Sequence, residues 1–430
     1  MTIRAAKALA FRELKSARTP RAEDLRALRE AVTEVLETVR RDGDKALAAY
    51  AKKFDGYEGP IRLGAKEIAE AQRALPADVI EGLDFAIERV TAFAQAQRAT
   101  LGEFEKEMLP GLFMGHRLVP VESAGAYVPA GRYPCLTSAV MSLAPAKVAG
   151  VKRLVTCSSP GRDKRLNPAI LYTMAKIGAD EIYCLGGAQA IAAMAFGTET
   201  IRRVDLVVGP GNQYVAEAKR QVYGAVGLDF LAGPSECMVI ADHTGRADFI
   251  AADLLAQCEH DPNARGALVT TSEKLGRAVL REIERQLKDL VTQEVARCSW
   301  ETNGIVVVTG TLEEAAAYAN DYAPEHLEVH TENPRALLPR LTCYGSLFLG
   351  EAAAEVFADK VAGTNHILPT LRGARRGGGL WVGTFLKTIT HQWVSEDAKE
   401  KLARYAVRQS EFEGMDAHRR AALIRLTGKL

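Results

Sequence analysis

The 430-residue chain has little of several features that would point to a specialised class of protein. Its formal net charge is +1, which argues against a nucleic-acid binder held by bulk positive charge. Its seven cysteines are an odd number without a Cys-x-x-Cys pair, so neither a disulfide framework nor a cysteine zinc site is expected. The amino terminus lacks the basic and apolar segments of a secretory signal, and no apolar run is long enough to span a bilayer. We therefore expect a soluble, cytoplasmic protein.

Three glycine-bearing turns follow predicted strands, but none has the Gly-x-Gly-x-x-Gly fingerprint of standard dinucleotide sites. They span residues 185–189, 208–212 and 232–236, and the first two lead directly into predicted helices. Glycine lets the backbone approach a ligand, and a helix amino terminus favours a phosphate. The side-chain amides of Gln189 and Asn212 lie where they could bind ribose or pyrophosphate. Ordinary strand-to-helix turns are the alternative.

Hydrophobic residues make up 47% and charged residues 25% of the chain, as in ordinary globular proteins, and the length allows two to four domains. Apolar residues recur at helical spacing over 20–41, around 47–54 and over 76–100, with Gly43 ending the first run. We expect residues 1–117 to form a helical region that packs on the main body. A helical arm that binds a partner is the alternative.

From about residue 118, short β-branched runs alternate with helical segments, which predicts an α/β fold with parallel sheets covered by helices. The predicted strands are 153–157, 181–185, 205–208, 237–241, 267–270 and 305–308, and the predicted helices are 167–177, 188–196, 213–222, 247–257 and 273–290. We expect two related lobes over 118–240 and 241–376. Residues 377–430 show no obvious sheet role and form a tail with helices over 395–408 and 417–426, which could reach a second subunit.

A carboxylic acid and an imidazole stand side by side at Glu325 and His326, directly after Pro324. Proline suits the first position of a helix, so a helical turn is expected to begin there. The positive end of its dipole would keep Glu325 ionised and His326 neutral, so both could accept protons. A surface pair that caps a helix is the alternative.

Candidate metal ligands are spread over three segments. Gln257 and His260 are three residues apart on one helix, so they share a face, whereas Cys258 is expected to be packed in the core. Asp359 begins a polar segment over 359–370 that is typical of a site loop, and His418 lies in the tail. These four residues could hold a zinc ion that acts as a Lewis acid. Gln-x-x-His alone is weak evidence, because a histidine at a helix end is common.

Taken together, these motifs resemble the histidinol dehydrogenase family over nearly the whole chain. The matching segments are 125–129, 145–151, 186–191, 208–212, 233–236, 257–261, 323–327, 363–366, 413–414 and 417–418. The resemblance implies a homodimer with two Rossmann-like lobes, one zinc ion per subunit and NAD as the oxidant. It also implies that a primary alcohol is oxidised through the aldehyde to the carboxylate, with two NAD reduced.

The resemblance assigns roles to individual residues. It implies that Glu325 and His326 act as the bases, with His326 taking the hydroxyl proton and Glu325 activating water for the aldehyde step. The implied sets are Tyr127, Gln189 and Asn212 for the cofactor; Gln257, His260, Asp359 and His418 for zinc, which also fixes the substrate; and Ser235, His326, Glu413 and the nearby His366 for the substrate. The tail is implied to cross to the partner subunit.

L-Histidinol is the default substrate, but two segments depart from the usual biosynthetic pattern. One covers residues 130–138, and the other, 371–387, carries Arg372, Arg375, Arg376 and Lys387 without an acidic residue. The second segment looks closer to a branch of the family that oxidises sulfopropanediol. A cationic loop near the site would suit a sulfonate, because arginine pairs well with oxyanions. These arginines could instead contact a partner subunit or solvent, and Glu413 would suit a cationic substrate. Two further hypotheses are a zinc hydrolase and a non-catalytic binding protein.

Overall fold

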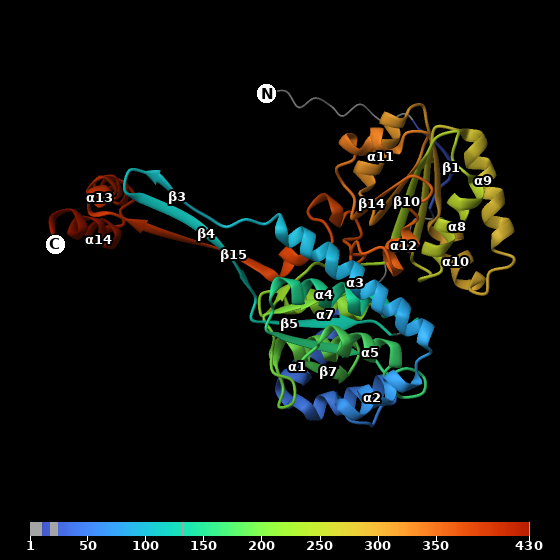
Figure 1. Cartoon of the computed structure of the whole chain (residues 1–430), viewed down its shortest axis with the longest axis horizontal. Helices are drawn as coiled ribbons and strands as arrows, with labels where there is room; N and C mark the ends of the chain where they lie inside the picture. Colours follow the sequence, from blue (N-terminus) through green and yellow to red (C-terminus); the bar gives the residue numbers. More distant parts are fainter. Residues whose placement is uncertain (1–10, 18–24, 131–132, 430) are drawn as a thin grey trace.

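The computed structural model describes residues 11–17, 25–130 and 133–429, which form two α/β lobes and one long arm (Figure 1). The start of the predicted helix at 20–24 and Gly131 and Arg132 of the divergent segment lie outside the described residues. Within the described ranges, no helix combines the length and the apolar character needed to cross a membrane.

The first lobe is built on a six-stranded sheet with the order β2-β7-β6-β5-β8-β9. All of its strands are parallel except β2, which pairs antiparallel with β7. The strands are β2 (Arg62–Leu63), β5 (Ser123–Val128), β6 (Arg153–Ser158), β7 (Glu181–Cys184), β8 (Leu206–Val208) and β9 (Gly227–Leu228). Every residue of β5 and β6 is buried, because helices cover both faces, and this explains their continuous apolar character.

The helices of the first lobe confirm the predicted amino-terminal helices from residue 25 to residue 99. They are α1 (Leu25–Tyr50), the short turn η1 (Ala51–Asp55), α2 (Ala65–Ala74), α3 (Ala77–Ala99), α4 (Leu136–Ala149), α5 (Pro168–Ile177), α6 (Gly187–Phe196) and α7 (Gln213–Val222). Helix α1 packs against α6 and α7, and α3 packs against α4. Gly43 has non-helical angles that divide α1, as the sequence predicted.

The second lobe has a six-stranded sheet with the order β1-β12-β11-β10-β13-β14, parallel except for β1. The strands are β1 (Phe11–Lys15), β10 (Glu236–Ala241), β11 (Arg265–Thr270), β12 (Ile305–Thr309), β13 (His326–His330) and β14 (Ser346–Leu349). The helices are α8 (Ala247–Cys258), α9 (Glu273–Gln286) and α10 (Gln293–Asn303) on one face, α11 (Leu312–Tyr322) on the other, and α12 (Glu355–Lys360). Short turns η2 (Pro334–Arg340), η3 (Gly373–Arg375) and η4 (Val382–Phe385) complete the lobe and its link to the arm.

Two lobe boundaries differ from the expected ones. Strand β10, which was expected to end the first lobe, begins the sheet of the second, and β1 from the amino-terminal region adds an antiparallel edge to that same sheet. Strand order along the chain does not reveal these pairings, because they are decided by which sheet edge is free in the folded lobe.

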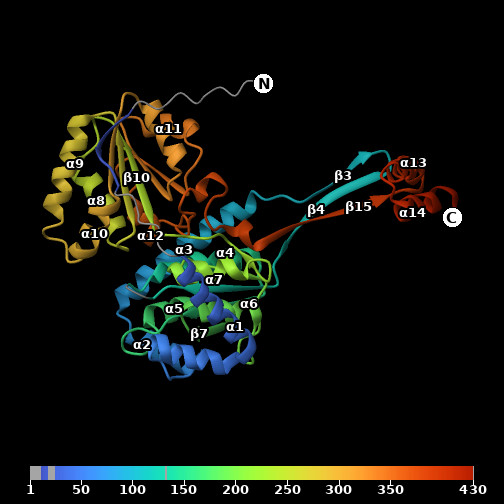
Figure 2. The ribbon, with the colours of Figure 1, turned by 180° about the vertical axis from the view of Figure 1, so that it is seen from behind.

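The arm is a three-stranded antiparallel sheet with two helices at its tip (Figures 1 and 2). It consists of β3 (Phe104–Leu109), β4 (Leu112–Pro120), β15 (Leu386–Val394), α13 (Glu396–Phe412) and α14 (Asp416–Thr427). The prediction of a helical region is therefore wrong for residues 104–117, and the expectation that the tail has no sheet role is wrong for β15. Strand β15 pairs along the whole of β4, a long-range contact that local periodicity does not show.

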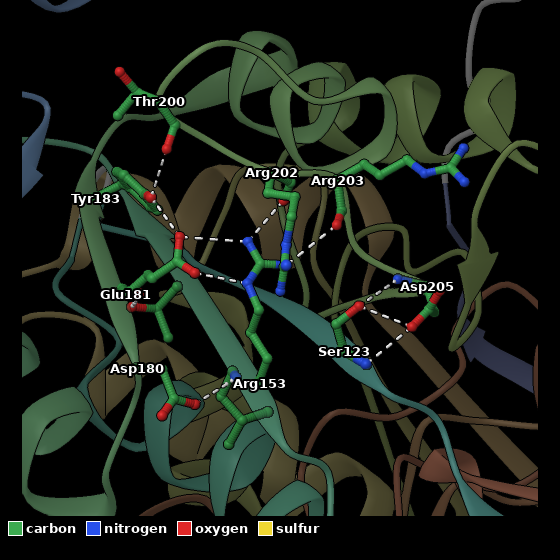
Figure 3. A network of polar contacts seen from close by, with 11 residues as sticks. Ser123, Arg153, Asp180, Glu181, Tyr183, Thr200, Arg202, Arg203 and Asp205 are labelled. Carbon is green, nitrogen blue, oxygen red and sulfur yellow. Dashed lines mark hydrogen bonds and ion pairs between the residues drawn. The ribbon is translucent and has the colours of Figure 1, made fainter.

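A polar network fixes the amino ends of the first sheet (Figure 3). The Arg153 guanidinium lies 2.6 Å from the Glu181 carboxylate and donates to the carbonyls of Arg202 and Arg203 at 2.8 and 3.1 Å. Beside it, the Asp205 carboxylate accepts from the backbone and the hydroxyl of Ser123 at 2.9 and 2.8 Å. These bonds hold β5, β6 and β7 to the segment before β8, so this end of the sheet is structural and the opposite end is left for ligands.

Candidate functional site

A cavity of about 880 Å³ opens at the carboxyl ends of the first sheet. Its lining includes all three residues that the sequence predicted for a cofactor, Tyr127, Gln189 and Asn212, together with His260 from the second lobe. Strand β5 lies between β6 and β8, so the sheet order reverses beside it, and ligands of open α/β sheets bind at such points. The position and size of the cavity therefore suit a nucleotide cofactor.

The turn after β8 is held by a buried ion pair that no sequence motif indicated. Lys219 donates to the carbonyl of Gly209 at 2.9 Å and to Asp229 at 2.5 Å, and Asp229 accepts from the Gly209 backbone at 2.9 Å. Gly209 has φ 108°, and a Cβ there would lie 2.2 Å from the Tyr127 carbonyl oxygen. Only glycine allows this close approach, which sets the turn against β5 at the cavity.

The three predicted cofactor residues are held in different ways. The hydroxyl of buried Tyr127 accepts from the backbone N–H of Gly187 at 3.2 Å, and burial raises the pKa of Tyr127. Asn212 caps α7 by accepting from the backbones of Tyr214 and Val215, which leaves its side-chain N–H groups for a ligand. Gln189 is buried in the first turn of α6.

Glu325 and His326 do not begin a helix, so that prediction is wrong. Helix α11 ends at Tyr322, Ala323 adopts a left-handed conformation with φ 54°, and β13 begins at His326. Pro324 therefore follows a helix end, where proline is also common, instead of starting a turn. Strand β13 is formed because it pairs on both sides, with β10 and β14.

Backbone atoms of Glu236 fix both members of the pair. The Glu236 N–H donates to Glu325 Oε2 at 2.8 Å, and the Glu236 carbonyl lies 3.0 Å from His326 Nδ1. A carbonyl can only accept, so Nδ1 carries the proton of this bond, and in a neutral imidazole Nε2 is then the basic nitrogen. His326 Nε2 is buried without a hydrogen-bond partner, 3.5 Å from the Glu355 carboxylate.

The pKa of His326 shifts in the direction expected for this pair, whereas the pKa of Glu325 shifts in the opposite direction. Burial lowers the pKa of His326, so its imidazole is neutral as predicted, although the cause is desolvation and not a helix dipole. Burial raises the pKa of Glu325 well above its ordinary value, and the nearby Glu236 carboxylate adds to this. The helix dipole that was expected to favour ionised Glu325 is absent, because a strand forms where the helix was predicted, and burial shifts the pKa of Glu325 in the opposite direction.

Three of the four predicted zinc ligands belong to neighbouring elements. Gln257 ends α8, His260 follows it, and Asp359 lies on α12, which packs against α8. Gln257 Oε1 is buried without a partner. Burial opposes the charge of Asp359, but His366, Lys360 and His260 together lower its pKa to about 2.

This donor set fits zinc. An ionised carboxylate, an imidazole and an unpaired amide oxygen are oxygen and nitrogen donors of the kind that zinc accepts, and buried polar atoms are normally paired. His366 lies beside them, because its Nδ1 is 3.1 Å from Asp359 Oδ1 and its Nε2 is 3.4 Å from the Ser138 hydroxyl. Burial lowers the pKa of His366 to about 4, so this ring is neutral near pH 7. Cys258 is buried in the core, as predicted.

The structure does not bring the tail residues to this site within one chain. Glu413 directly follows α13 and His418 lies on α14, and both are exposed at the tip of the arm, away from the lobes (Figures 1 and 2). Ser235 is half-buried directly before β10, next to Glu236.

Sequence reasoning missed Glu236 and Glu355. Burial raises the pKa of each to about 7, and each contacts the Glu325–His326 pair, Glu236 by its backbone and Glu355 by its carboxylate. Glu236 lies in one of the three glycine-bearing segments that the sequence does single out, whereas nothing local distinguishes Glu355 from a surface acid. Only the fold shows that it faces His326.

The arginines of the divergent segment make contacts within the chain. Arg372 and Arg375 lie 3.0 and 3.5 Å from the Asp321 carboxylate, and Arg375 also donates to the Asn320 carbonyl at 3.0 Å. Both side chains are about half exposed. They therefore tie this segment to the end of α11, and neither is among the residues that line the cavity.

Comparison with known proteins gives a consistent result. The histidinol dehydrogenase family profile matches residues 18–426. The chain is 45% identical to a histidinol dehydrogenase homolog of Shouchella clausii over 92% of this chain and 94% of that protein, and 40% identical to a sulfopropanediol 3-dehydrogenase of Ruegeria pomeroyi over 96% and 95%. It is 43% identical to the histidinol dehydrogenase of Geobacillus kaustophilus over 93% and 94%. The crystal structure of histidinol dehydrogenase from Elizabethkingia anophelis superposes with a TM-score of 0.90 at 36% identity, covering 96% of this chain and 94% of that one.

Proposed function

The chain belongs to the histidinol dehydrogenase family, and we propose that it is a zinc- and NAD-dependent enzyme that oxidises a small primary alcohol through the aldehyde to the carboxylate, reducing two NAD. L-Histidinol is the proposed substrate. The observation that carries this proposal is the buried, unpaired Nε2 of His326, whose ring lies close enough to Asp359 for the two charges to interact, while His260 of the same predicted zinc group lines the cofactor cavity. A zinc hydrolase would not need a cavity that suits a nucleotide cofactor.

In the first half-reaction, His326 Nε2 accepts the hydroxyl proton of the alcohol. The Glu236 carbonyl keeps the ring in the tautomer that leaves Nε2 free, and burial keeps it neutral. Glu355, 3.5 Å away, can stabilise the imidazolium that forms. When bound, zinc would polarise the substrate oxygen and NAD would take up the hydride.

In the second half-reaction, Glu325 accepts a proton from the water that attacks the aldehyde. Its raised pKa makes its carboxylate a stronger base than that of an ordinary glutamate. The Glu236 N–H, which donates to Glu325 Oε2, stabilises the ionised form and fixes its direction.

We propose that Gln257, His260 and Asp359 hold the zinc ion together with His418 of a second copy. Ligands on exposed helices at the tip of an arm cannot complete a site in the lobes of the same chain. The arm exposes an unusual number of large apolar side chains: Phe104, Met108, Met114, Ile389, Trp393, Tyr405, Phe412, Met415 and Ile424. Such surfaces are typical of obligate interfaces, and an exchanged arm in a twofold dimer would cover them.

Mixed dimers test the exchange directly. His326→Gln disables the lobe half of the site, and His418→Ala disables the arm half, so each variant alone should be inactive. Co-expression of the two should restore about a quarter of the sites, because random pairing makes half of the dimers mixed and each has one intact site. Without exchange, every site keeps one defect and the mixture stays inactive, a result that would reject the exchanged arm. Sedimentation of each variant checks that dimers form.

The sulfopropanediol alternative is supported by the Ruegeria pomeroyi relative, but less by the arginines that first suggested it. Arg372 and Arg375 are already engaged by Asp321, whereas Glu413 on the arm would suit a cationic or imidazole substrate. The decisive measurement compares kcat/KM for L-histidinol and sulfopropanediol with the zinc-loaded enzyme. A higher value for sulfopropanediol would reject L-histidinol, and no NADH with any alcohol would reject the dehydrogenase.

A further inference from the structure

We propose that Asp253, Glu328 and His330 form a second divalent metal site, buried between α8 and β13. Among the described residues these three side chains offer ligand atoms that all lie within 4.8 Å of one another. None of them belongs to the zinc site proposed above.

The fold places these residues on one wall. Cys237, Val239 and Ala241 of β10 pack against α8, and they pair in register with His326, Glu328 and His330 of β13. Neighbouring residues in register point to the same face of a sheet, so Glu328 and His330 also face the α8 side. Asp253 lies one turn before Gln257 on α8 and therefore on the same helix face. The proposed second site therefore lies beside the first, one helical turn before Gln257 on α8 and just after His326 on β13.

Two of the three side chains have ligand atoms without a hydrogen-bond partner. Both ring nitrogens of His330 and Glu328 Oε2 are buried without a hydrogen bond, although His330 Nε2 lies only 3.2 Å from Glu328 Oε2. The side chains of His330 and Glu328 are fully buried. Buried polar atoms that converge without pairing normally have a further group between them.

The charges also point to a cation. Two carboxylates balance the charge of a divalent ion, whereas two carboxylates alone repel each other in a buried site. In line with this, burial and then the Glu328 carboxylate raise the pKa of Asp253 to about 8. Mixed imidazole and carboxylate ligands suit zinc and the neighbouring first-row ions.

The other oxygen of Glu328 gives this site a structural role. Glu328 Oε1 accepts from the Glu355 N–H at 2.8 Å, at the start of α12. A metal ion would therefore tie β13, α8 and α12 together, and these elements carry His326, Gln257 and Asp359. The ion would position the proposed zinc ligands without touching the substrate.

Metal titration tests the proposal. Purified protein is stripped with a chelator and titrated with Zn²⁺ alone, and bound metal per chain is measured by elemental analysis. Wild type should bind about two ions per chain, and Asp253→Asn, His330→Gln and His418→Ala about one each. Asp253→Asn combined with His418→Ala should bind none. Asp248→Asn, on the exposed part of the same helix, is the matched control and should keep both ions.

A second readout separates this site from the proposed catalytic one. In the His418→Ala background, added Zn²⁺ should still raise the melting temperature, and Asp253→Asn should abolish that rise. If Asp253→Asn and His330→Gln keep the wild-type metal content, the second site is rejected, and the three side chains share protons only. If His418→Ala keeps the wild-type metal content while Asp253→Asn and His330→Gln each lose one ion, the assignment of His418 to the catalytic zinc is wrong and the second site is supported. Asp253 is only partly buried, so Asp253→Asn decides if His330→Gln does not fold.

Discussion

The lobes and the arm carry parts of the same proposed site in opposite physical surroundings. In the lobes, His326, Glu325 and Gln257 are buried, and their polar atoms are either fixed by the Glu236 backbone or left unpaired. On the arm, Glu413 and His418 are exposed, among large apolar side chains that are themselves exposed. Burial shifts the pKa values of the lobe residues before any ligand arrives, whereas the proposed exchange would bury the arm residues only in a dimer.

This difference separates two tasks. Proton transfer needs groups of shifted pKa at fixed positions, which the packed lobes supply. Closure of the metal site needs ligands that arrive from outside, which the arm can supply. Changes in the lobes should therefore affect chemistry and stability, and changes in the arm should affect metal content and assembly.

The largest effect is expected when the lobe base is removed. His326→Gln should lower kcat for alcohol oxidation about 10²–10⁴-fold, because the proton acceptor is lost. Metal content should stay unchanged, in contrast with His418→Ala. NADH formation and elemental analysis check the two parts, and His243→Gln in an exposed turn is the control. An active His326→Gln enzyme would mean that another group accepts the proton.

The next effect concerns the buried pair behind the cofactor turn. Asp229→Ala should lower the free energy of unfolding by about 3–5 kcal/mol, because Lys219 would be left buried and uncompensated. On the arm, Glu105→Gln removes a partly exposed contact with His391 and should cost less than about 1 kcal/mol. Urea denaturation measures both. Similar losses in the two variants would remove the contrast between lobes and arm.

A smaller but more specific effect is expected in the pH dependence. A base works when deprotonated, so the raised pKa of Glu325 should move the acidic limb of aldehyde oxidation above the ordinary glutamate value of 4.5. Because the pKa of His326 is lowered, the limb of alcohol oxidation should lie below 6.5. Glu325→Gln should then slow aldehyde oxidation more than alcohol oxidation. Equal losses in the two half-reactions would contradict the division of roles.

The smallest effect is expected for the cationic segment. Arg372→Ala and Arg375→Ala break half-exposed ion pairs with Asp321, so each should change stability by less than about 1 kcal/mol and leave KM unchanged. Thermal denaturation and steady-state kinetics measure both quantities. A large rise in KM for sulfopropanediol alone would show that these arginines bind a sulfonate after all.

The sequence predicted most of the regular elements, because their signals are local. Helices α5, α6, α7 and α8 and strands β6, β11 and β12 lie within a few residues of the predicted bounds. The sequence did not predict strands β13 and β15. Strand β13 forms because it pairs with β10 and β14, and β15 forms because it pairs with β4, which is distant in the sequence. The sequence also predicted that Tyr127, Gln189 and Asn212 would share one site, and the cavity brings them together.

By itself the sequence determined the alternation of strands and helices, the family and the candidate site residues, since these depend on side-chain identity and short-range order. Only the tertiary structure decided the direction of the Glu325 pKa shift, the unpaired nitrogen of His326, the contacts of Glu236 and Glu355 with this pair, and the separation of His418 from its expected partners. Protonation follows from burial, and hydrogen bonding and separation follow from which elements pack together. These are properties of the folded environment that no stretch of sequence carries alone.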